Sequence, residues 1–285
     1  MLLFNVINFQ EKGGGTLKVG VVGVGNIGGI IANRLVESKL FQPKEVFLSN
    51  RSTEKLKPFI ERGYAITGTG EISKLCDIIF LCVKPQDSER MFEELGPAED
   101  RILISTMTAV SIDRIERKTR AKRIVRIMPN VPAMIGEGLV GACRSSHVDD
   151  ETWQTCLRVL SCLGTVVEVK EEQMEAVTAL SGSAPAFFFV ILEALIDAGI
   201  RMGLSYEKSR LMVLETMAGS AKLLLKLENH PGEFRHVVTS PAGTTIEGIY
   251  RMEREGVRGA LMKTIHETYL RALQLKNELN DQLGG

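Results

Sequence analysis

Residues 17–29 read Leu-Lys-Val-Gly-Val-Val-Gly-Val-Gly-Asn-Ile-Gly-Gly, and no other part of the chain says as much about its architecture. The apolar run from Val19 to Val22 has the length of a buried strand. A Gly-x-Gly-x-x-Gly turn follows it directly, and apolar side chains then recur at helical spacing. A strand, a glycine turn and a helix in this order are typical of dinucleotide-binding folds.

Each glycine of the turn has its own expected task. Gly23 permits the tight turn, Gly25 lets the backbone approach a pyrophosphate, and Gly28 lets the helix pack closely on the strand. The pyrophosphate is expected at the helix N-terminus, where free N–H groups favour negative charge. The alternative is a glycine-rich turn that holds no ligand. We assign the whole turn to cofactor binding: Gly23, Val24, Gly25, Asn26, Ile27 and Gly28.

Charge and composition exclude several classes of partner. Lys plus Arg equals Asp plus Glu at 35 each, so no overall field favours nucleic acid or an anionic membrane. The apolar run from about Thr178 to Leu192 is broken by small residues and a proline, and we expect it to be too short to span a bilayer. Neither a nucleic acid nor a membrane is therefore an expected partner.

The cysteines and histidines show no spacing typical of a metal site. None of the 5 cysteines forms a C-x-x-C pair, and the 4 histidines do not combine with them at ligand spacing. We expect buried, reduced thiols, no metal, and a cytoplasmic location.

The segment 17–170 alternates strand-like and helix-like patterns. Such alternation favours an α/β fold with a doubly wound parallel sheet. Strands are expected at 17–22, 45–49, 77–82, 101–105, 123–127, 138–143 and 165–169, with helices near 26–40, 53–62 and 86–95. Residues 1–16 lack the basic start and cleavage pattern of a signal peptide, and we expect them to lie outside the fold.

Strand patterns stop after residue 170, and long helices are expected over 171–285. They fall near 184–203, 205–227, 243–255 and 257–280. The segment from Phe187 to Leu192 is apolar on every side, and a helix of that kind must be buried. We expect a second subunit to cover it in a homodimer; the alternative is a core helix inside a single domain.

The end of the second expected strand indicates which cofactor binds. Enzymes that use NAD commonly place an acid there, on the ribose 2′-hydroxyl. This chain has Asn50, Arg51 and Ser52 instead, and an arginine fork attracts a 2′-phosphate. We therefore predict NADPH, with NADH as an alternative donor. Ser52 has a second interpretation as the N-cap of the next helix.

Several blocks together resemble the pyrroline-5-carboxylate reductase family, from Leu17 to about Leu275. The resemblance implies an N-terminal Rossmann domain and a helical C-terminal domain that interlocks two chains into a dimer, with dimers assembling into rings. It also implies reduction of 1-pyrroline-5-carboxylate to L-proline, the last step of proline biosynthesis. The blocks are residues 23–28, 80–86, 126–133, 179–186 and 238–246.

The resemblance implies further site residues. Val83, Lys84 and Pro85 match the loop along the cofactor, and Lys84 is interpreted as a positioning residue rather than a proton donor or a plain surface lysine. Met128 and Asn130 match the loop near the nicotinamide.

On the substrate side, Ser240 and Thr244 match the loop that holds the carboxylate. Thr245 matches the hydroxyl nearest the imine, and Glu228 aligns with a carboxylate near the ring nitrogen. Without the resemblance, the hydroxyls of this loop would be interpreted as helix caps.

Three alanines stand where the family usually has glycine. They are Ala109, Ala184 and Ala242. Ala184 precedes Pro185, so an extended backbone is expected there. Ala242 is strained if its φ is positive. These changes leave two alternatives open: reduction of another cyclic imine, or binding of NADP(H) without turnover in a regulatory role.

Overall fold

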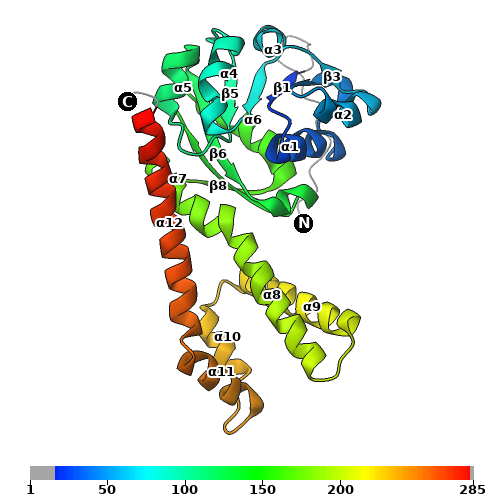
Figure 1. The fold of residues 1–285 in the computed structure, drawn as a ribbon, viewed down its shortest axis with the longest axis vertical. Helices are drawn as coiled ribbons and strands as arrows, with labels where there is room; N and C mark the ends of the chain where they lie inside the picture. Colours follow the sequence, from blue (N-terminus) through cyan, green and yellow to red (C-terminus); the bar gives the residue numbers. More distant parts are fainter. Residues whose placement is uncertain (1–16, 283–285) are drawn as a thin grey trace. The chain divides into compact units, whose positions relative to one another are not determined.

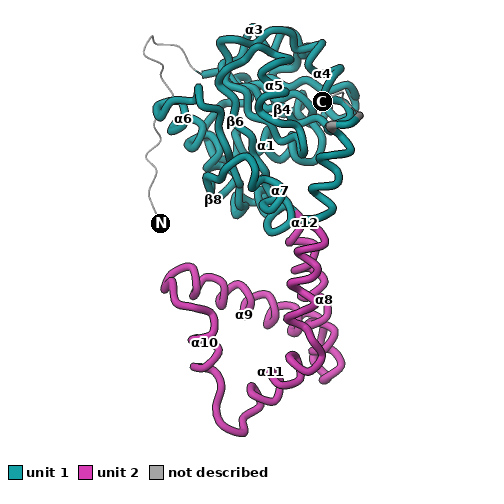
Figure 2. Tube along the Cα trace, turned by 90° about the vertical axis from the view of Figure 1, so that its left-hand side faces the viewer, with its two compact units in different colours: residues 1–182, 269–285 teal, residues 183–268 magenta. Residues whose placement is uncertain are grey.

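The computed structural model describes residues 17–282, so the expectation for residues 1–16 lies outside the described part. The chain forms two compact units (Figure 2). The first comprises the residues up to 182 together with those from 269, and the second comprises residues 183–268.

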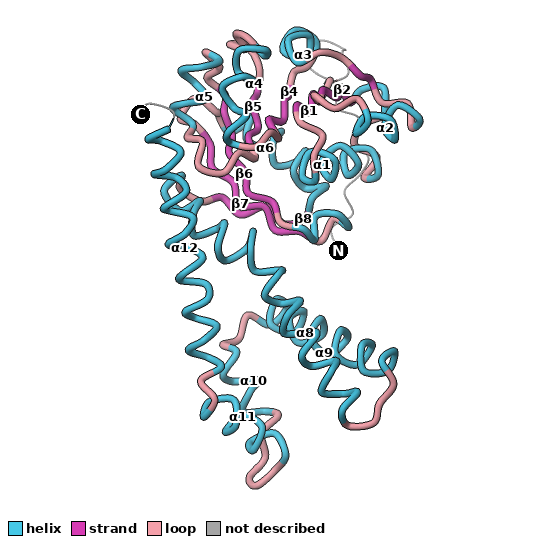
Figure 3. Tube along the Cα trace, in the orientation of Figure 1, coloured by secondary structure: helices cyan, strands magenta, loops and turns pink. Residues whose placement is uncertain are grey.

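An eight-stranded sheet forms the centre of the first unit in the described part of the chain. Its order is β3-β2-β1-β4-β5-β6-β7-β8, and every neighbouring pair is parallel except β6 and β7. The expected α/β fold is confirmed, with β3 as a strand that the sequence did not reveal (Figure 3). The strands are β1 Val19–Val22, β2 Val46–Ser49, β3 Ala65–Ile66, β4 Ile78–Leu81, β5 Ile102–Ser105, β6 Arg123–Pro129, β7 Gly138–Arg144 and β8 Gly164–Glu168.

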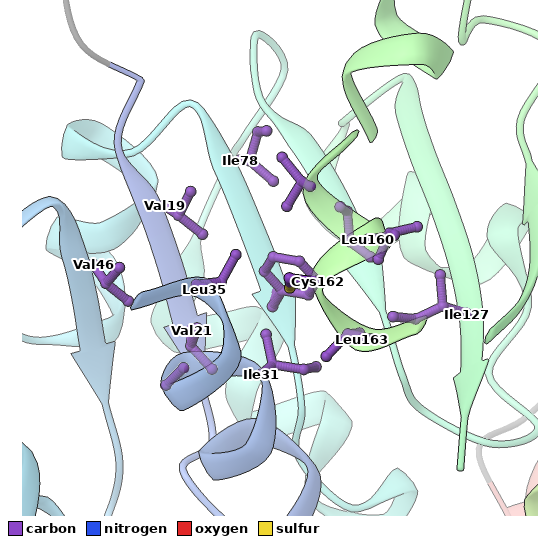
Figure 4. Close-up of a cluster of buried hydrophobic side chains, with 14 of the residues drawn as sticks. Val19, Val21, Ile31, Leu35, Val46, Ile78, Ile127, Leu160, Cys162 and Leu163 are labelled. Carbon is purple, nitrogen blue, oxygen red and sulfur yellow. The ribbon is translucent and has the colours of Figure 1, made fainter. Parts of the chain in front are cut away.

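Helices cover both faces of this sheet, as the alternation along β4 shows. Ile78 and Phe80 belong to one buried cluster, whereas Ile79 and Leu81 belong to another. The first cluster includes side chains of α1 and α6 (Figure 4), and the second includes side chains of α3, α4 and α5. A sheet buried on both faces explains why its strands are apolar throughout. The helices are α1 Asn26–Glu37, α2 Lys57–Glu61, α3 Thr69–Leu75, α4 Ser88–Leu95, α5 Ile112–Thr119, α6 Asp150–Leu160 and α7 Met174–Val177.

The second unit is helical. Its helices are α8 Ala184–Arg201, α9 Tyr206–Leu227, α10 Pro231–Val237, α11 Thr244–Arg254 and the first turns of α12 Val257–Gln282 (Figure 1). The four expected helices are present, and α10 is additional. Phe188 and Val190 on α8 are 53% and 65% exposed, so one chain does not bury this apolar helix. The alternative of a core helix within a single domain is therefore wrong.

The last turns of α12 pack in the first unit. Leu279 belongs to the second buried cluster, and Lys276 Nζ lies 3.2 Å from the buried Glu175 Oε1. The predicted domain boundary between residues 170 and 171 marks the change from strands to helices. It does not coincide with the division between the two compact units, and it remains a prediction.

The helical stretch Glu171–Arg201 is long and apolar enough to cross a membrane by length and composition, and it alone meets that test among the described residues. The expectation that this region is too short to span a bilayer is therefore wrong, because the helix extends on both sides of the apolar run.

Candidate cofactor and substrate sites

The glycine turn connects β1 to α1, and its three glycines meet different surroundings. Gly23 has φ +95°, and a Cβ there would lie 2.7 Å from the Cys82 carbonyl oxygen. A Cβ at Gly28 would overlap the Gly23 carbonyl oxygen and lie 3.1 Å from the Cys82 Cβ. A Cβ at Gly25 would meet nothing within 4 Å. Packing therefore requires glycine at 23 and 28, whereas the space at Gly25 suits a ligand that approaches the backbone.

A cavity of about 690 Å³ lies beside this turn. The strand order reverses at β1, which pairs with both β2 and β4, and ligands of open α/β sheets bind at such a switch point. α1 begins at its N-cap Gly25 without a side-chain cap, which leaves N–H donors for an anion. The predicted residues that line the cavity are Gly23, Gly25, Asn50, Arg51, Val83 and Lys84.

The other predicted cofactor residues do not line this cavity. They are Val24, Asn26, Ile27, Gly28, Ser52, Pro85, Met128 and Asn130. The cavity wall also contains residues that were not predicted from the sequence to bind the cofactor, among them Lys55, Thr69, Asp87, Arg90 and Glu94. Lys55 comes from the 3-10 turn before α2, Thr69 from α3, and the other three from α4 and the 3-10 turn before it. Because helix α3 was not predicted, Thr69 was not assigned to the site.

Asn50 holds the glycine turn in place. Its Oδ1 accepts a hydrogen bond from the Val24 N–H at 3.0 Å, and its Nδ2 donates to the Ser52 carbonyl oxygen at 3.0 Å. The Gly23 N–H donates to the Ser49 carbonyl oxygen at 2.8 Å. Ser52 does not cap the next helix, because α2 has Leu56 at its N-cap position, so that alternative is wrong.

Arg51 is held at the cavity wall by an acid from another strand end. Its Nη1 lies 2.9 Å from Asp87 Oδ1, and its Nη2 donates to Asp87 Oδ2 at 3.0 Å. Asp87 belongs to the 3-10 turn Pro85–Asp87, which follows β4. Lys84, at the N-cap of that turn, is exposed.

Cys82 also lines the cavity. Burial raises its pKa to about 12, so the thiol is neutral near pH 7 and presents no charge to the cofactor. All 5 cysteines are free, as expected. No cluster of three or more His, Cys, Asp or Glu side chains in the described residues is arranged to hold a metal ion.

Asn130 ties the start of the β6–β7 connection to a π-helix, Thr178–Ser183. Its Oδ1 accepts from the Leu139 N–H at 2.9 Å, and its Nδ2 donates to Ser181 Oγ at 3.2 Å. Met128 lies beside the same π-helix, 3.6 Å from where a Cβ on Gly182 would be. Single π-helical turns are frequent at functional sites.

The predicted carboxylate loop lies in the second unit, before α11. The Gly243 N–H donates to the Ser240 carbonyl oxygen at 3.1 Å, which closes a turn over Pro241 and Ala242. Gly243 is the N-cap of α11, and no side chain caps this helix. A Cβ at Gly243 would overlap Ser240 Oγ, so this hydroxyl lies over the helix start. The alternative of a Ser or Thr cap is wrong, and the N-terminal N–H groups stay available to an anion.

Thr244 and Thr245 form the first positions of α11. Neither hydroxyl makes a hydrogen bond within the described part of the chain, and the same holds for Ser240. Glu228 follows α9 in the left-handed conformation, with φ +54°, and its side chain is exposed.

Two of the three alanines that replace glycine are strained. Ala109 has φ +66° and Ala242 has φ +57°, both in the left-handed region that favours glycine. Ala184 is the first residue of α8, so the expected extended backbone before Pro185 is wrong. Proline at the second helical position lacks only an N–H that has no partner in the helix, which reconciles Pro185 with a helix start.

The fold and the cavity define a Rossmann-type dinucleotide-binding protein. Comparisons with known proteins agree and are more specific. A family model described as "NADP oxidoreductase coenzyme F420-dependent" matches residues 18–109, and one described as "Pyrroline-5-carboxylate reductase dimerisation" matches residues 171–275. The C-terminal helices are therefore a self-association region.

Full-length relatives identify the family. A pyrroline-5-carboxylate reductase from Aquifex aeolicus is 36% identical over 91% of this chain and 98% of that protein. One from Synechocystis is 31% identical over the same shares of the two chains. A structure of a pyrroline-5-carboxylate reductase from Coxiella burnetii, 31% identical, superposes with a TM-score of 0.82 over 92% of this chain and 99% of its own. The chain belongs to the pyrroline-5-carboxylate reductase family.

Proposed function

We propose that this chain reduces 1-pyrroline-5-carboxylate to L-proline with NADPH. The observation that carries the proposal is the start of α11, where helix N–H groups and the hydroxyls of Ser240, Thr244 and Thr245 lack partners within the described residues. A helix start of this kind suits a small carboxylate, and the substrate is a cyclic imine that carries one. This segment also falls within the residues that the dimerisation model matches.

The cofactor supplies the hydride when it is bound. The glycine turn from Gly23 to Gly28 would hold its pyrophosphate, with Gly23 and Gly25 at the cavity wall and the other residues shaping the turn. Arg51 would bind a 2′-phosphate. A related reductase from Plasmodium falciparum, 26% identical and with a TM-score of 0.79 over 90% of this chain and 97% of its own, has NADP bound, which supports NADPH over NADH.

Other residues support the cofactor indirectly in this proposal. Asn50 fixes the turn through Val24, and Asn130 fixes the connection beside Met128. We also place four residues along the cofactor because of the family resemblance: Ser52, Val83, Lys84 and Pro85. Two of them, Val83 and Lys84, line the cavity.

The protein's part in the chemistry is to position the substrate and to stabilise charge. Ser240, Thr244 and the first N–H groups of α11 are proposed to bind the carboxylate. Thr245 is proposed to hydrogen-bond the ring nitrogen, directly or through a water molecule. A protonated imine is already electrophilic, so its reduction needs no protein nucleophile. The role of Glu228 near the nitrogen rests on the resemblance alone.

A matched pair of variants at Thr245 tests the substrate assignment. Thr245→Ala is expected to lower kcat by ~100- to 1,000-fold with 1-pyrroline-5-carboxylate, in the range of a lost transition-state hydrogen bond. The dissociation constant for NADPH should stay unchanged. Thr245→Ser retains the hydroxyl and should recover most of the turnover. Full activity in Thr245→Ala would remove this residue from the mechanism.

The two alternatives predict different results with the unmodified chain. Turnover of pyrroline-2-carboxylate but not of 1-pyrroline-5-carboxylate would indicate that Ala242 has changed the pocket. NADPH binding without turnover of either imine would indicate a regulatory protein.

The assembly and location belong to the same proposal. We propose a homodimer through the C-terminal helices, with dimers able to form larger rings, and domains at 17–170 and 171–285. The exposed apolar side chains of α8 are then covered by a second copy rather than by lipid. The 5 free cysteines support the cytoplasm. Neither a nucleic acid nor a membrane is a proposed partner. Light scattering without detergent should give a dimer or a multiple of it.

A further inference from the structure

We propose that Asp87 sets the choice between NADPH and NADH, by acting opposite Arg51 at the place where the two cofactors differ. The proposal rests on the cofactor site described under the proposed function. NAD enzymes usually carry an acid at the end of the second strand, and β2 of this chain has none there. The proposal assigns that specificity-determining role to Asp87, which follows β4.

An acid from a different strand end lies beside Arg51. Asp87 lies 36 residues beyond Arg51 in the chain, in the turn after β4, yet its two carboxylate oxygens pair with the two terminal nitrogens of Arg51 at 2.9 and 3.0 Å. Two parallel contacts fix the plane of the guanidinium. Both residues line the same cavity.

The local structure shows that the Asp87 carboxylate is directed to Arg51 rather than to its own helix. Asp87 is the N-cap residue of α4, a position where an aspartate usually accepts a hydrogen bond from a backbone N–H of the first turn. It makes no such cap bond.

The remaining charges of the cavity leave Asp87 as the acid that faces Arg51. Glu94 pairs with Arg90 at 2.7 Å, one turn apart on α4. Lys55 and Lys84 make no ion pair within the described residues. Asp87 is therefore the acid paired with Arg51, in a wall that also carries Lys55, Lys84 and the Arg90–Glu94 pair. Removing its carboxylate makes the surroundings of Arg51 more positive.

An acid and an arginine at one place act oppositely on the two cofactors. A carboxylate accepts a hydrogen bond from the ribose 2′-hydroxyl of NADH, and it repels the 2′-phosphate of NADPH. It also offsets the charge of Arg51. Asp87 thus moderates a preference for NADPH that Arg51 and Lys55 alone would make stronger, and it keeps NADH as a usable donor.

The test is the ratio of dissociation constants for NAD⁺ and NADP⁺, measured by calorimetry without substrate. Asp87→Asn keeps the shape and one hydrogen-bond acceptor but removes the charge, and it is expected to raise the ratio about tenfold in favour of NADP⁺. Arg51→Gln should lower the ratio. Because Arg51 is 60% and Asp87 27% exposed, the pair adds little to stability and both variants should fold.

Glu94→Gln is the matched control, since it removes one negative charge from the same wall without touching Arg51. It should change the ratio by less than about twofold. An unchanged or lower ratio in Asp87→Asn, or an equal rise in Glu94→Gln, would overturn the inference. A raised ratio in a chain that fails to reduce 1-pyrroline-5-carboxylate would uphold it while refuting the proposed function. If the unmodified chain binds neither dinucleotide, both fall.

Discussion

Substituting alanine at Gly25 and at Gly28 should separate cofactor binding from folding. The two glycines lie three residues apart in one turn, yet a Cβ at Gly25 would meet nothing within 4 Å, whereas one at Gly28 would overlap a backbone oxygen. Gly25→Ala should therefore fold normally and bind NADPH poorly. Gly28→Ala should unfold more easily.

The magnitudes follow from the local structure. Gly25 has φ −92°, which alanine adopts freely, and replacing an N-cap glycine by alanine costs about 0.5–1 kcal/mol. At Gly28 the added methyl overpacks the β1–α1 junction, which costs about 1–3 kcal/mol. The better helix propensity of alanine returns at most about 1 kcal/mol there. We expect Tm to fall by about 2–4 °C for Gly25→Ala and by roughly twice that for Gly28→Ala.

NADPH affinity should fall more in Gly25→Ala than in Gly28→Ala, which is the reverse of the order expected for Tm. The methyl of Gly25→Ala would occupy the space proposed for the pyrophosphate. We expect NADPH affinity to fall at least tenfold, which corresponds to about 1.4 kcal/mol or more. Thermal unfolding and a fluorescence titration with NADPH on the same preparations measure both quantities. Gly25→Ala with unchanged NADPH affinity would refute the proposed role of the turn. A larger loss of Tm in Gly25→Ala than in Gly28→Ala would refute the packing argument.

The left-handed alanines and the buried thiols give two more predictions. Ala109→Gly and Ala242→Gly should each raise the free energy of unfolding by up to about 1 kcal/mol, because glycine relieves the positive φ, whereas Ala184→Gly inside a helix start should lower it. Urea unfolding at one protein concentration checks the signs, and a fall in all three variants would contradict the assignment of strain. Burial raises the pKa of four thiols to about 12, against 9.0 for an ordinary thiol: Cys76, Cys82, Cys156 and Cys162. Above about pH 9 the unfolded chain loses thiol protons that the folded chain keeps, so stability should fall as pH rises from 9 toward 12. Denaturant melts across that range test this, and Cys→Ala variants at these positions should show a shallower fall.

Strands that are buried on both faces appear in the sequence as short runs of apolar residues. These runs made most strands of the sheet predictable. The strands from β1 to β8 were predicted except β3, which has only two residues. The antiparallel pairing of β6 with β7 could not be foreseen, because pairing direction depends on tertiary contacts rather than on the apolar pattern. α10 was not predicted because proline, here Pro231, usually interrupts a helix. Proline is nevertheless favoured at the first helical position, which Pro231 occupies.

At the cofactor cavity, the sequence indicated Arg51 but not the acid beside it. Asp87 follows a different strand, and only the parallel arrangement of β1, β2 and β4 brings the two strand ends together. Asn50 was predicted as a cofactor residue, and its observed bonds to Val24 and Ser52 show that it also orders the turn. Such bonds depend on side-chain direction, which spacing does not reveal.

A deuterium label shows whether the hydride of NADPH reaches the imine carbon. The purified chain is incubated with 1-pyrroline-5-carboxylate and NADPH that carries deuterium at the transferable position of the nicotinamide, and the product is examined by mass spectrometry. We expect L-proline with one deuterium at C5. Unlabelled proline, or oxidation of NADPH without any proline, would contradict it.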